Sequence, residues 1–306
     1  MSLEALVKEL RDPARPLIAS KLADLSALSS DELTLLLRAW PETAVGRRRQ
    51  IMRQLVDLAE DDVELNFDAV FIANLKDDDA EVRQLAVHGL WEYEGRDLIG
   101  PLIDVLLGDP DAGVRAQAAL ALGRFALRAE FRHLSEADSR RVEGALRGAI
   151  DNQQEALEVR GRAVEAAGAL NVPWVRSSIE DAYRSRHRRL RLSAVHAMGR
   201  TCDPRWLPLL RQEFLSDDPE MRYEAASACG SVCDESAVLY LKPLLEDDDA
   251  EVQEAAIAAM GEIGGADAKR ALKEMEDHLE LRVREAAAAA LEEMEFNEDP
   301  LGFHHL

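Results

Sequence analysis

A short pattern recurs along this chain at nearly constant intervals. Each copy has an acidic turn, an apolar residue, usually an Arg, and then small residues at helical spacing. The steps between the apolar residues are 32, 45, 31, 31, 31 and 31 residues. A fixed period of about 20–50 residues is the signature of a stacked repeat architecture. The apolar residue of each copy, called position 0 below, is Val82, Val114, Val159, Leu190, Met221, Val252 and Val283.

Small residues form a stripe on one face of each copy. Position +4 is Ala in all seven copies, and position +7 is Gly or Ala. Positions 0, +4, +7 and +8 share a helical face, so each copy predicts an amphipathic helix that its neighbour can approach closely. Gly at position +9 predicts the end of the helix, because Gly adopts the left-handed conformation at little cost. These glycines are Gly123, Gly168, Gly199, Gly230 and Gly261.

A shorter apolar segment precedes these helices. Clear examples are residues 98–107, 206–210 and 238–245, each with a Pro near its first turn, where a missing N–H costs least. Each unit is therefore predicted to be a helical hairpin of about 31 residues. One hairpin cannot bury both of its faces, but a stack can. The predicted fold class is all-α: an α-solenoid (α-α superhelix) of stacked helical hairpins.

The repeated residues resemble a known family. The pattern Asp-x-x-Val-Arg-x-x-Ala-x-x-Ala-Leu-Gly at a 31-residue period is similar to the short HEAT repeats, of the kind also found in bilin lyases. The resemblance covers roughly residues 79–292 and implies an armadillo-like superhelix. One scaffold hosts many functions, so the resemblance indicates the fold and not the activity.

The repeats also suggest divisions along the chain. Residues 1–70 are predicted to form a divergent helical cap, in which Arg48 replaces the apolar residue of a degenerate copy. Residues 71–295 hold the seven HEAT-like repeats, and the 45-residue step marks an insertion near residues 125–138. That insertion is either a structural extension or a binding element. Residues 296–306 are predicted to be a C-terminal tail.

The composition indicates the compartment of the protein and the classes of partner it can bind. Acidic residues number 59 against 37 basic residues, which gives a net charge of -22. No apolar run is long enough to span a membrane, and the first residues lack a signal-peptide pattern. Three cysteines fit a reducing compartment. We therefore expect a cytoplasmic protein that makes no contact with a membrane, and the net charge disfavours nucleic acid as a partner.

The repeated charges have a structural interpretation. Arg occupies position +1 in six of the seven copies, and most turns before position 0 are acidic. An enzyme does not need the same residue in every repeat, so we expect each Asp to cap its helix and each Arg to join a ladder between repeats. The turns lack the Gly and the bidentate Glu of an EF-hand loop, which favours capping over calcium binding.

One turn carries the opposite charge. Residues 183–191 contain five Arg in a strongly acidic chain. This basic edge is interpreted as a docking point for an acidic partner or for the acidic edge of a second copy, which would allow self-association. The alternative is a solvated loop that neutralises neighbouring Asp residues. Its candidate docking residues are Arg184, Arg186, Arg188 and Arg189.

The outward face of the repeated helices is the main candidate site. Positions +2, +3, +6 and +10 lie opposite the core stripe. In repeat solenoids these second helices usually line the concave surface, where partners bind. The alternative is an ordinary solvated surface. The predicted partner-binding residues are Arg124, Arg162, Glu165, His196, Arg200 and Tyr223.

Signals of catalysis are weak. None of the seven His residues is followed by Glu, so the His-Glu iron-binding motif of the HEAT-repeat deoxyhypusine hydroxylases is missing. Cys229 and Cys233 lie one helical turn apart, with Cys202 in the preceding repeat, and we favour buried small residues over a zinc site. No phosphate-binding Gly loop or nucleophile motif is present. We therefore predict no catalytic residue, no metal and no cofactor.

The sequence thus predicts a non-enzymatic scaffold that binds another protein through the concave surface of a solenoid. Two alternatives follow from repeat similarity alone. One is a bilin lyase-like protein that attaches or detaches a tetrapyrrole. The other is a HEAT-like DNA glycosylase, which would need a basic concave surface and aromatic side chains around a flipped base.

Overall fold

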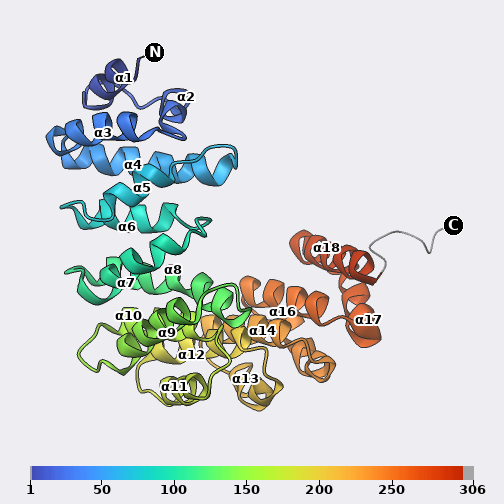
Figure 1. Ribbon diagram of the computed structural model, residues 1–306. Coiled ribbons are helices and arrows are strands. Elements are labelled where there is room, and N and C mark those ends of the chain that lie inside the picture. The colour runs from blue at the N-terminus through green and yellow to red at the C-terminus, as the bar shows by residue number, and fades with distance from the viewer. Residues whose placement is uncertain (1, 299–306) are drawn as a thin grey trace. The chain divides into compact units, whose positions relative to one another are not determined.

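The chain is built of helices. The computed structural model describes residues 2–298, in which eighteen α-helices and six short 3₁₀ helices (η) alternate and no strand occurs (Figure 1). The predicted all-α solenoid class is confirmed. The chain forms two compact units, residues 1–163 and residues 164–306.

The first unit contains a layer of successive long helices with shorter helices packed on it. Its elements are α1 (Leu3–Leu10), α2 (Ala19–Leu22), η1 (Ala23–Leu25), α3 (Ser30–Ala39), η2 (Trp40–Glu42), α4 (Val45–Asp61), α5 (Asp68–Asn74), α6 (Ala80–Gly89), η3 (Arg96–Leu98), α7 (Ile99–Gly108), α8 (Ala112–Glu130) and α9 (Glu136–Asp151). Helix α4 packs on α6 and α6 on α8, while α5 covers α6 and α7 covers α8 (Figure 1). Helix α10 (Leu157–Ala167) contains the point of division.

The second unit repeats this two-layer arrangement. Its elements are α11 (Pro173–Tyr183), α12 (Arg188–Arg200), η4 (Pro204–Trp206), α13 (Leu207–Glu213), α14 (Pro219–Val232), η5 (Glu235–Ala237), α15 (Val238–Leu241), η6 (Lys242–Glu246), α16 (Ala250–Ile263), α17 (Gly265–Met275) and α18 (Leu281–Glu298). Helices α12, α14, α16 and α18 pack one on the next and form the layer of second helices. Helices α11, α13 and α17 lie on their outer side, as the first helices of the hairpins (Figure 1).

The predicted core face is confirmed. Every residue at position 0 is buried, and every Ala at position +4 is completely inaccessible to solvent. Burial of a Val or Leu side chain contributes roughly 1.5–3 kcal/mol, so each copy of position 0 adds to the apolar stabilisation of the stack.

The prediction that Gly at position +9 ends each helix is wrong for four of the five copies. Helices α8, α12, α14 and α16 continue past their glycine, and only α10 ends before it. None of the five has a left-handed φ, because the only glycines with positive φ in residues 2–298 are Gly264 and Gly265. The left-handed turn lies three residues later, at position +12, where Cys202 has φ 49°, Cys233 φ 54° and Gly264 φ 72°.

The glycines at position +9 instead allow two second helices to touch. A Cβ atom added to Gly199 would lie 2.8 Å from the Cα of Ala228 in the next helix, and one added to Gly230 would lie 2.9 Å from the Cα of Ala259. Real Cβ atoms essentially never approach a backbone so closely. Gly199 and Gly230 are therefore required at position +9, because there it faces position +7 of the next repeat.

A ladder of Arg and Asp side chains joins neighbouring repeats, as predicted. Arg83 Nε and Nη2 donate to the carboxylate of Asp109 in the next repeat at 2.7 and 2.9 Å, and its Nη1 donates to the carbonyl of Asp77 at 2.7 Å. Arg222 makes the same bidentate contact with Asp247, at 2.7 Å for both bonds. These largely buried pairs fix the rotation of one hairpin on the next.

The predicted helix caps are also confirmed. The carboxylate of Asp111 accepts hydrogen bonds from the backbone N–H groups of Gly113 and Val114 at 2.8 and 3.1 Å. Asp249 does the same for Glu251 and Val252 at 2.9 and 3.3 Å. These bonds satisfy N–H groups that the first turn of a helix leaves without a partner.

The degenerate copy in the first unit buries an Arg where the other copies bury an apolar residue. Arg48 Nη1 donates to Asp77 Oδ2 at 2.6 Å, and the indole N–H of Trp40 donates to the same oxygen at 2.7 Å. The pair is almost completely buried. Asp77 thus compensates the charge that replaces the apolar anchor.

The predicted division at residues 70 and 295 stays a prediction. Within the predicted insertion, α8 continues as a helix to Glu130, and α9 begins at Glu136. Residues 296–298 of the predicted tail belong to α18, whereas residues 299–306 lie outside the described residues.

The contact at position +9 predicts opposite effects for two Gly substitutions. Gly199→Ala should destabilise the chain by roughly 1–3 kcal/mol, because the added methyl group meets the backbone of the next helix. Gly148→Ala in α9 is the matched control, since its Cβ would meet nothing within 4 Å and Ala favours a helix by about 0.5–1 kcal/mol. Urea denaturation measures both free energies of unfolding, and equal effects would contradict the close contact.

The ladder also predicts a pH dependence. Hydrogen bonds from Arg49, at 2.9 and 2.6 Å, lower the pKa of Asp79 from 3.8 to about 2. A pKa depressed in the folded state stabilises the fold above the unfolded pKa, and the contribution is lost as the pH falls towards 2. Asp79→Asn keeps a capping side chain but removes the charge. Thermal unfolding should show the variant less stable than wild type at pH 7, with the difference shrinking below pH 4; a difference independent of pH would contradict the assignment.

Candidate functional site

Three predicted residues lie together on the outward face of α12 and α14. His196 and Arg200 come from α12, and Tyr223 comes from α14, which packs on it. Tyr223 is 38% exposed. Arg200 is exposed along part of its side chain, but burial of its guanidinium lowers its pKa. His196 Nδ1 lies 3.2 Å from Glu224 Oε2. We call His196, Arg200, Tyr223 and Glu224 the second-helix site.

The contact of His196 with Glu224 is one of a series that sequence reasoning missed. Each joins position +6 of one repeat to position +3 of the next. In the first unit His88 Nδ1 lies 3.2 Å from the amide nitrogen of Gln117. The signal was a polar residue at position +6 of one copy followed by a polar residue at position +3 of the next, as in His88 and Gln117. These contacts between positions +6 and +3 orient the polar side chains on the outward face of the second helices.

Glu165 occupies the same position +6 but is not part of an accessible face. Its side chain is buried, with only 5% of the residue exposed. Oε1 accepts a hydrogen bond from Ser193 Oγ at 2.8 Å and another from Arg189 Nη1 at 2.9 Å. The expectation that Glu165 meets a partner is therefore corrected, because the next repeat covers and neutralises its carboxylate.

The predicted residues Arg124 and Arg162 belong to the first unit, whereas Arg200 belongs to the second. Arg124 Nη1 donates to the carbonyl of Trp91 at 2.6 Å, and burial lowers the pKa of its guanidinium to about 10. Arg162 Nε donates to Glu158 one turn earlier at 3.1 Å. Arg124 thus holds the segment after α6 against α8. Its guanidinium is therefore only partly available to hydrogen-bond a partner.

The second-helix face becomes acidic towards the C-terminus of the second unit. Glu262 is exposed along part of its side chain, but partial burial of its carboxyl group, followed by repulsion from Glu293, raises its pKa. Arg282 compensates part of this charge through Glu254 at 3.4 Å. The face therefore changes from a cationic start at Arg200 to an anionic end. Its exposed carboxylates are Glu254, Glu262, Glu285 and Glu293.

The predicted basic edge is largely occupied by contacts within the chain. Arg188 donates to both oxygens of Asp218 in the next repeat, at 2.6 and 2.9 Å, and also to Glu220. The hydrogen bond from Arg188 lowers the pKa of Asp218. Arg189 is bound to Glu165, as described above. These two residues therefore support the interpretation of a neutralising loop.

The other two residues of the basic edge are more accessible. Arg184 Nη2 lies 3.3 Å from Glu180 one turn earlier on the helix, and its side chain is mostly exposed. Arg186 Nε donates to His187 Nε2 at 3.4 Å. Docking of an acidic partner through Arg184 and Arg186, or of a second copy, stays a proposal.

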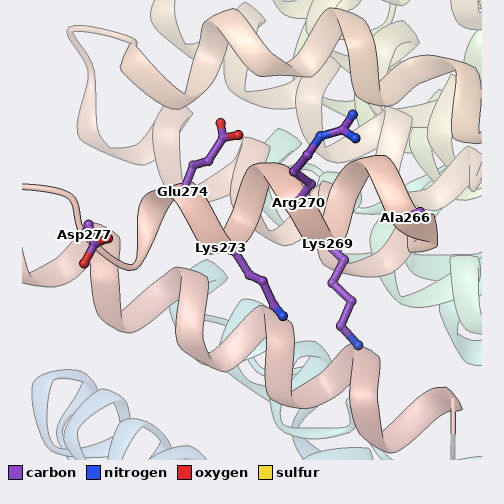
Figure 2. Close-up of a pocket in the computed structure, with 6 residues that line it drawn as sticks. All are labelled: Ala266, Lys269, Arg270, Lys273, Glu274 and Asp277. Carbon is purple, nitrogen blue, oxygen red and sulfur yellow. The ribbon is translucent and has the colours of Figure 1, made fainter.

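A shallow depression follows one side of α17. Its volume is about 520 Å³, and it is lined only by residues of α17 and the turn after it. Figure 2 shows Lys269 and Lys273 on one side of the helix and Arg270 and Glu274 on the other. Lys269 Nζ lies 3.5 Å from Glu295, and Arg270 pairs with Asp267. A depression with one wall and mixed charge does not resemble a catalytic cleft.

The three cysteines differ in exposure. Cys229 is buried in α14, and burial raises the pKa of its thiol to about 12. The interpretation as a buried small residue is wrong for Cys202 and Cys233, which are exposed because they lie at the left-handed turns after α12 and α14. Within residues 2–298, no group of three or more His, Cys, Asp or Glu side chains is placed to hold a metal ion. No helix in that range combines the length and the apolar character that crossing a bilayer requires.

The sequence matches the family model for HEAT repeats over residues 69–152 and 207–292. These two regions cover more than half of the chain. No curated protein sequence matches it significantly.

Solved structures share the fold at low sequence identity. A chain from the complex of CpcE and CpcF of phycocyanin lyase, from Nostoc sp. PCC7120, is 15% identical, with 92% of this chain and 97% of that one covered and a TM-score of 0.55. A chain from a structure of Kap95p with RanGDP is 15% identical, with 99% and 47% covered and a TM-score of 0.52. A chain from Kap121p bound to Pho4p is 16% identical, with 95% and 37% covered and a TM-score of 0.50. At these identities the similarity is one of fold.

The burial of the cysteines predicts a distinct pattern of thiol modification. In the native protein Ellman's reagent should react readily with Cys202 and Cys233 and slowly with Cys229, because the thiolate form of Cys229 is suppressed and shielded. All three should react in urea. Cys229→Ala should leave the native count unchanged. Rapid native reaction of all three thiols would contradict the placement of Cys229.

Proposed function

Because the chain belongs to the HEAT-repeat family, we propose that it is a non-enzymatic scaffold that binds another protein through the second-helix site. The proposal is supported by one observation above all. On a layer built mainly of Ala and Gly contacts, the partly exposed Tyr223 is followed in α14 by Glu224, whose carboxylate contacts His196 of α12, and Arg200 lies one helical turn after His196. Tyr and Arg are the side chains that most often dominate binding energy at protein interfaces.

The strongly shifted groups support a non-enzymatic role. An active site usually brings an acid, a base or a nucleophile with a shifted pKa into a cleft. In this chain Cys229 is buried and packs in the apolar core. Tyr183, whose pKa burial and a hydrogen bond to Glu213 raise, joins α11 to α13. Both groups act in packing, and we infer that the chain works by binding.

A protein is the partner class that the fold suits best. Solenoids expose one long, repeated face, and partners bind along it. The structures of similar fold with RanGDP and with Pho4p contain such protein partners. The charge gradient from Arg200 to the carboxylates of α16 and α18 favours a partner with acidic and basic regions in the matching order. The cytoplasmic location expected from the composition stays a prediction.

The two alternatives have weaker support. Chromophore attachment rests on a fold shared with a phycocyanin lyase chain, and an absorbance shift on mixing this protein with a bilin and its carrier subunit would favour it. The net charge of -22 disfavours binding to the phosphates of DNA, and therefore the DNA glycosylase alternative.

Site-specific photo-crosslinking tests the proposal directly. Replacing Tyr223 with p-benzoylphenylalanine should yield one or a few discrete protein adducts in native-host cells, because a bound partner would cover this side chain. The same substitution at Asp181, an exposed residue on the first helix α11, is the matched control and should not yield them. Adding Arg200→Glu to the Tyr223 probe should reduce the adducts by about ten-fold.

Circular dichroism should show both probe variants equally folded. Identical adducts from Tyr223 and Asp181, or none from Tyr223, would contradict the second-helix site as the binding surface.

A further inference from the structure

A groove lies in the layer of first helices of the second unit, away from the second-helix face. It runs between α13 and the α15–η6 segment of the next hairpin, and its volume is about 540 Å³. Ligand sites commonly have volumes of roughly 300–1,000 Å³, with apolar walls and a few polar groups. This groove has that composition.

The walls are apolar and unusually exposed. Leu215 and Leu239 line the groove with 88% and 67% of their surfaces in solvent. The rings of Pro208 and Pro243 add rigid apolar surface. Single exposed leucines are ordinary, but two of them beside prolines around a cavity form a patch of the kind that marks an interaction site.

Arg211 supplies the only charged side chain in the lining. Its guanidinium carbon lies 3.1 Å from the centroid of the Tyr240 ring, so the cation is stacked on an aromatic face. Within residues 2–298, Arg211 forms no ion pair, although many Arg residues of this acidic chain do. Stacking covers one face of the guanidinium and leaves its N–H edge free to bind a carboxylate by two hydrogen bonds.

We propose that this groove binds a short peptide segment of a partner protein in which an Asp or Glu is flanked by bulky apolar residues. The carboxylate pairs with Arg211, and the apolar side chains cover Leu215, Leu239 and the two prolines. Charge complementarity selects an acidic segment, since the groove presents one unpaired cation. The exposed leucines at its rim favour an extended peptide over a small molecule, which would leave them in water.

This groove is independent of the second-helix site. It is formed by first helices, whereas His196, Arg200 and Tyr223 lie on second helices. A failure of peptide binding would therefore leave the proposed scaffold function intact, and a failure of the crosslinking experiment would leave the groove intact.

Selection from a random nine-residue phage-displayed library on the full chain identifies the preferred peptides. We expect a consensus of one acidic residue between two Leu, Phe or Ile residues. Fluorescence anisotropy then measures the dissociation constants of the labelled consensus peptide and of the same peptide with Gln in place of its acid. Arg211→Gln should weaken the acidic peptide by at least about 10-fold and the Gln peptide by much less.

Two further variants complete the test. Leu239→Ser should weaken both peptides, because it removes an exposed apolar wall without disturbing the core. Arg270→Gln removes an exposed Arg of the first helix α17, outside the groove, and should change neither. Unchanged thermal unfolding would show that all three variants fold. A neutral or basic consensus, or an acidic peptide that Arg211→Gln binds as tightly as wild type, would overturn the proposal.

Discussion

Close contact between successive second helices is the constraint on which this structure depends. Gly at position +9 brings the backbone of one helix against an Ala at position +7 of the next, as Gly199 does with Ala228. A methyl group at Gly199 would already be too large. Because contacts at this distance involve many atom pairs, each small in energy, the stack gains its stability collectively. The same spacing sets the distance between the side chains that each helix presents to solvent.

The Arg–Asp ladder fixes how one hairpin is rotated on the next. Apolar and Ala contacts alone would tolerate rotation of one hairpin on another, whereas the bidentate bond of Arg222 to Asp247 has one favourable geometry. In the repeat that lacks an Asp to accept the hydrogen bonds of the ladder Arg, a different ion pair joins the two hairpins. Ser216 stands at the position that Asp247 holds in the next repeat, and Arg188 binds Asp218 there instead. A local change in the ladder thus explains Arg188 of the basic edge.

Periodicity predicted the features that recur with the same residue types in successive copies. The buried positions 0 and +4, the Asp caps and the Arg ladder all follow from the spacing of residue types. The role of Gly at position +9 could not be predicted from the spacing. A Gly near the end of a helix is compatible with a C-cap and with a close contact to another helix, and only the position of the next helix distinguishes the two. Glu165 was misplaced for a similar reason: a single helix puts it outward, but Arg189 and Ser193 of the next repeat cover it.

Surfaces formed by two hairpins are hardest to read from the sequence. Arg211 and Tyr240 are separated by 29 positions and meet only after the first helices stack. Tyr223 and His196 likewise come from different repeats. The sequence named several of the residues, and the structure grouped them into separate surfaces.

We propose that this scaffold binds its partner through the outward face of the second helices. Amide hydrogen exchange of the chain with and without its purified crosslinked partner tests that claim most directly. We expect slower exchange upon binding in α12, α14 and the segments that follow them, with α11 and α17 unchanged. Protection confined to α11, α13 and α17, or no protection at all in a saturated complex, would contradict it.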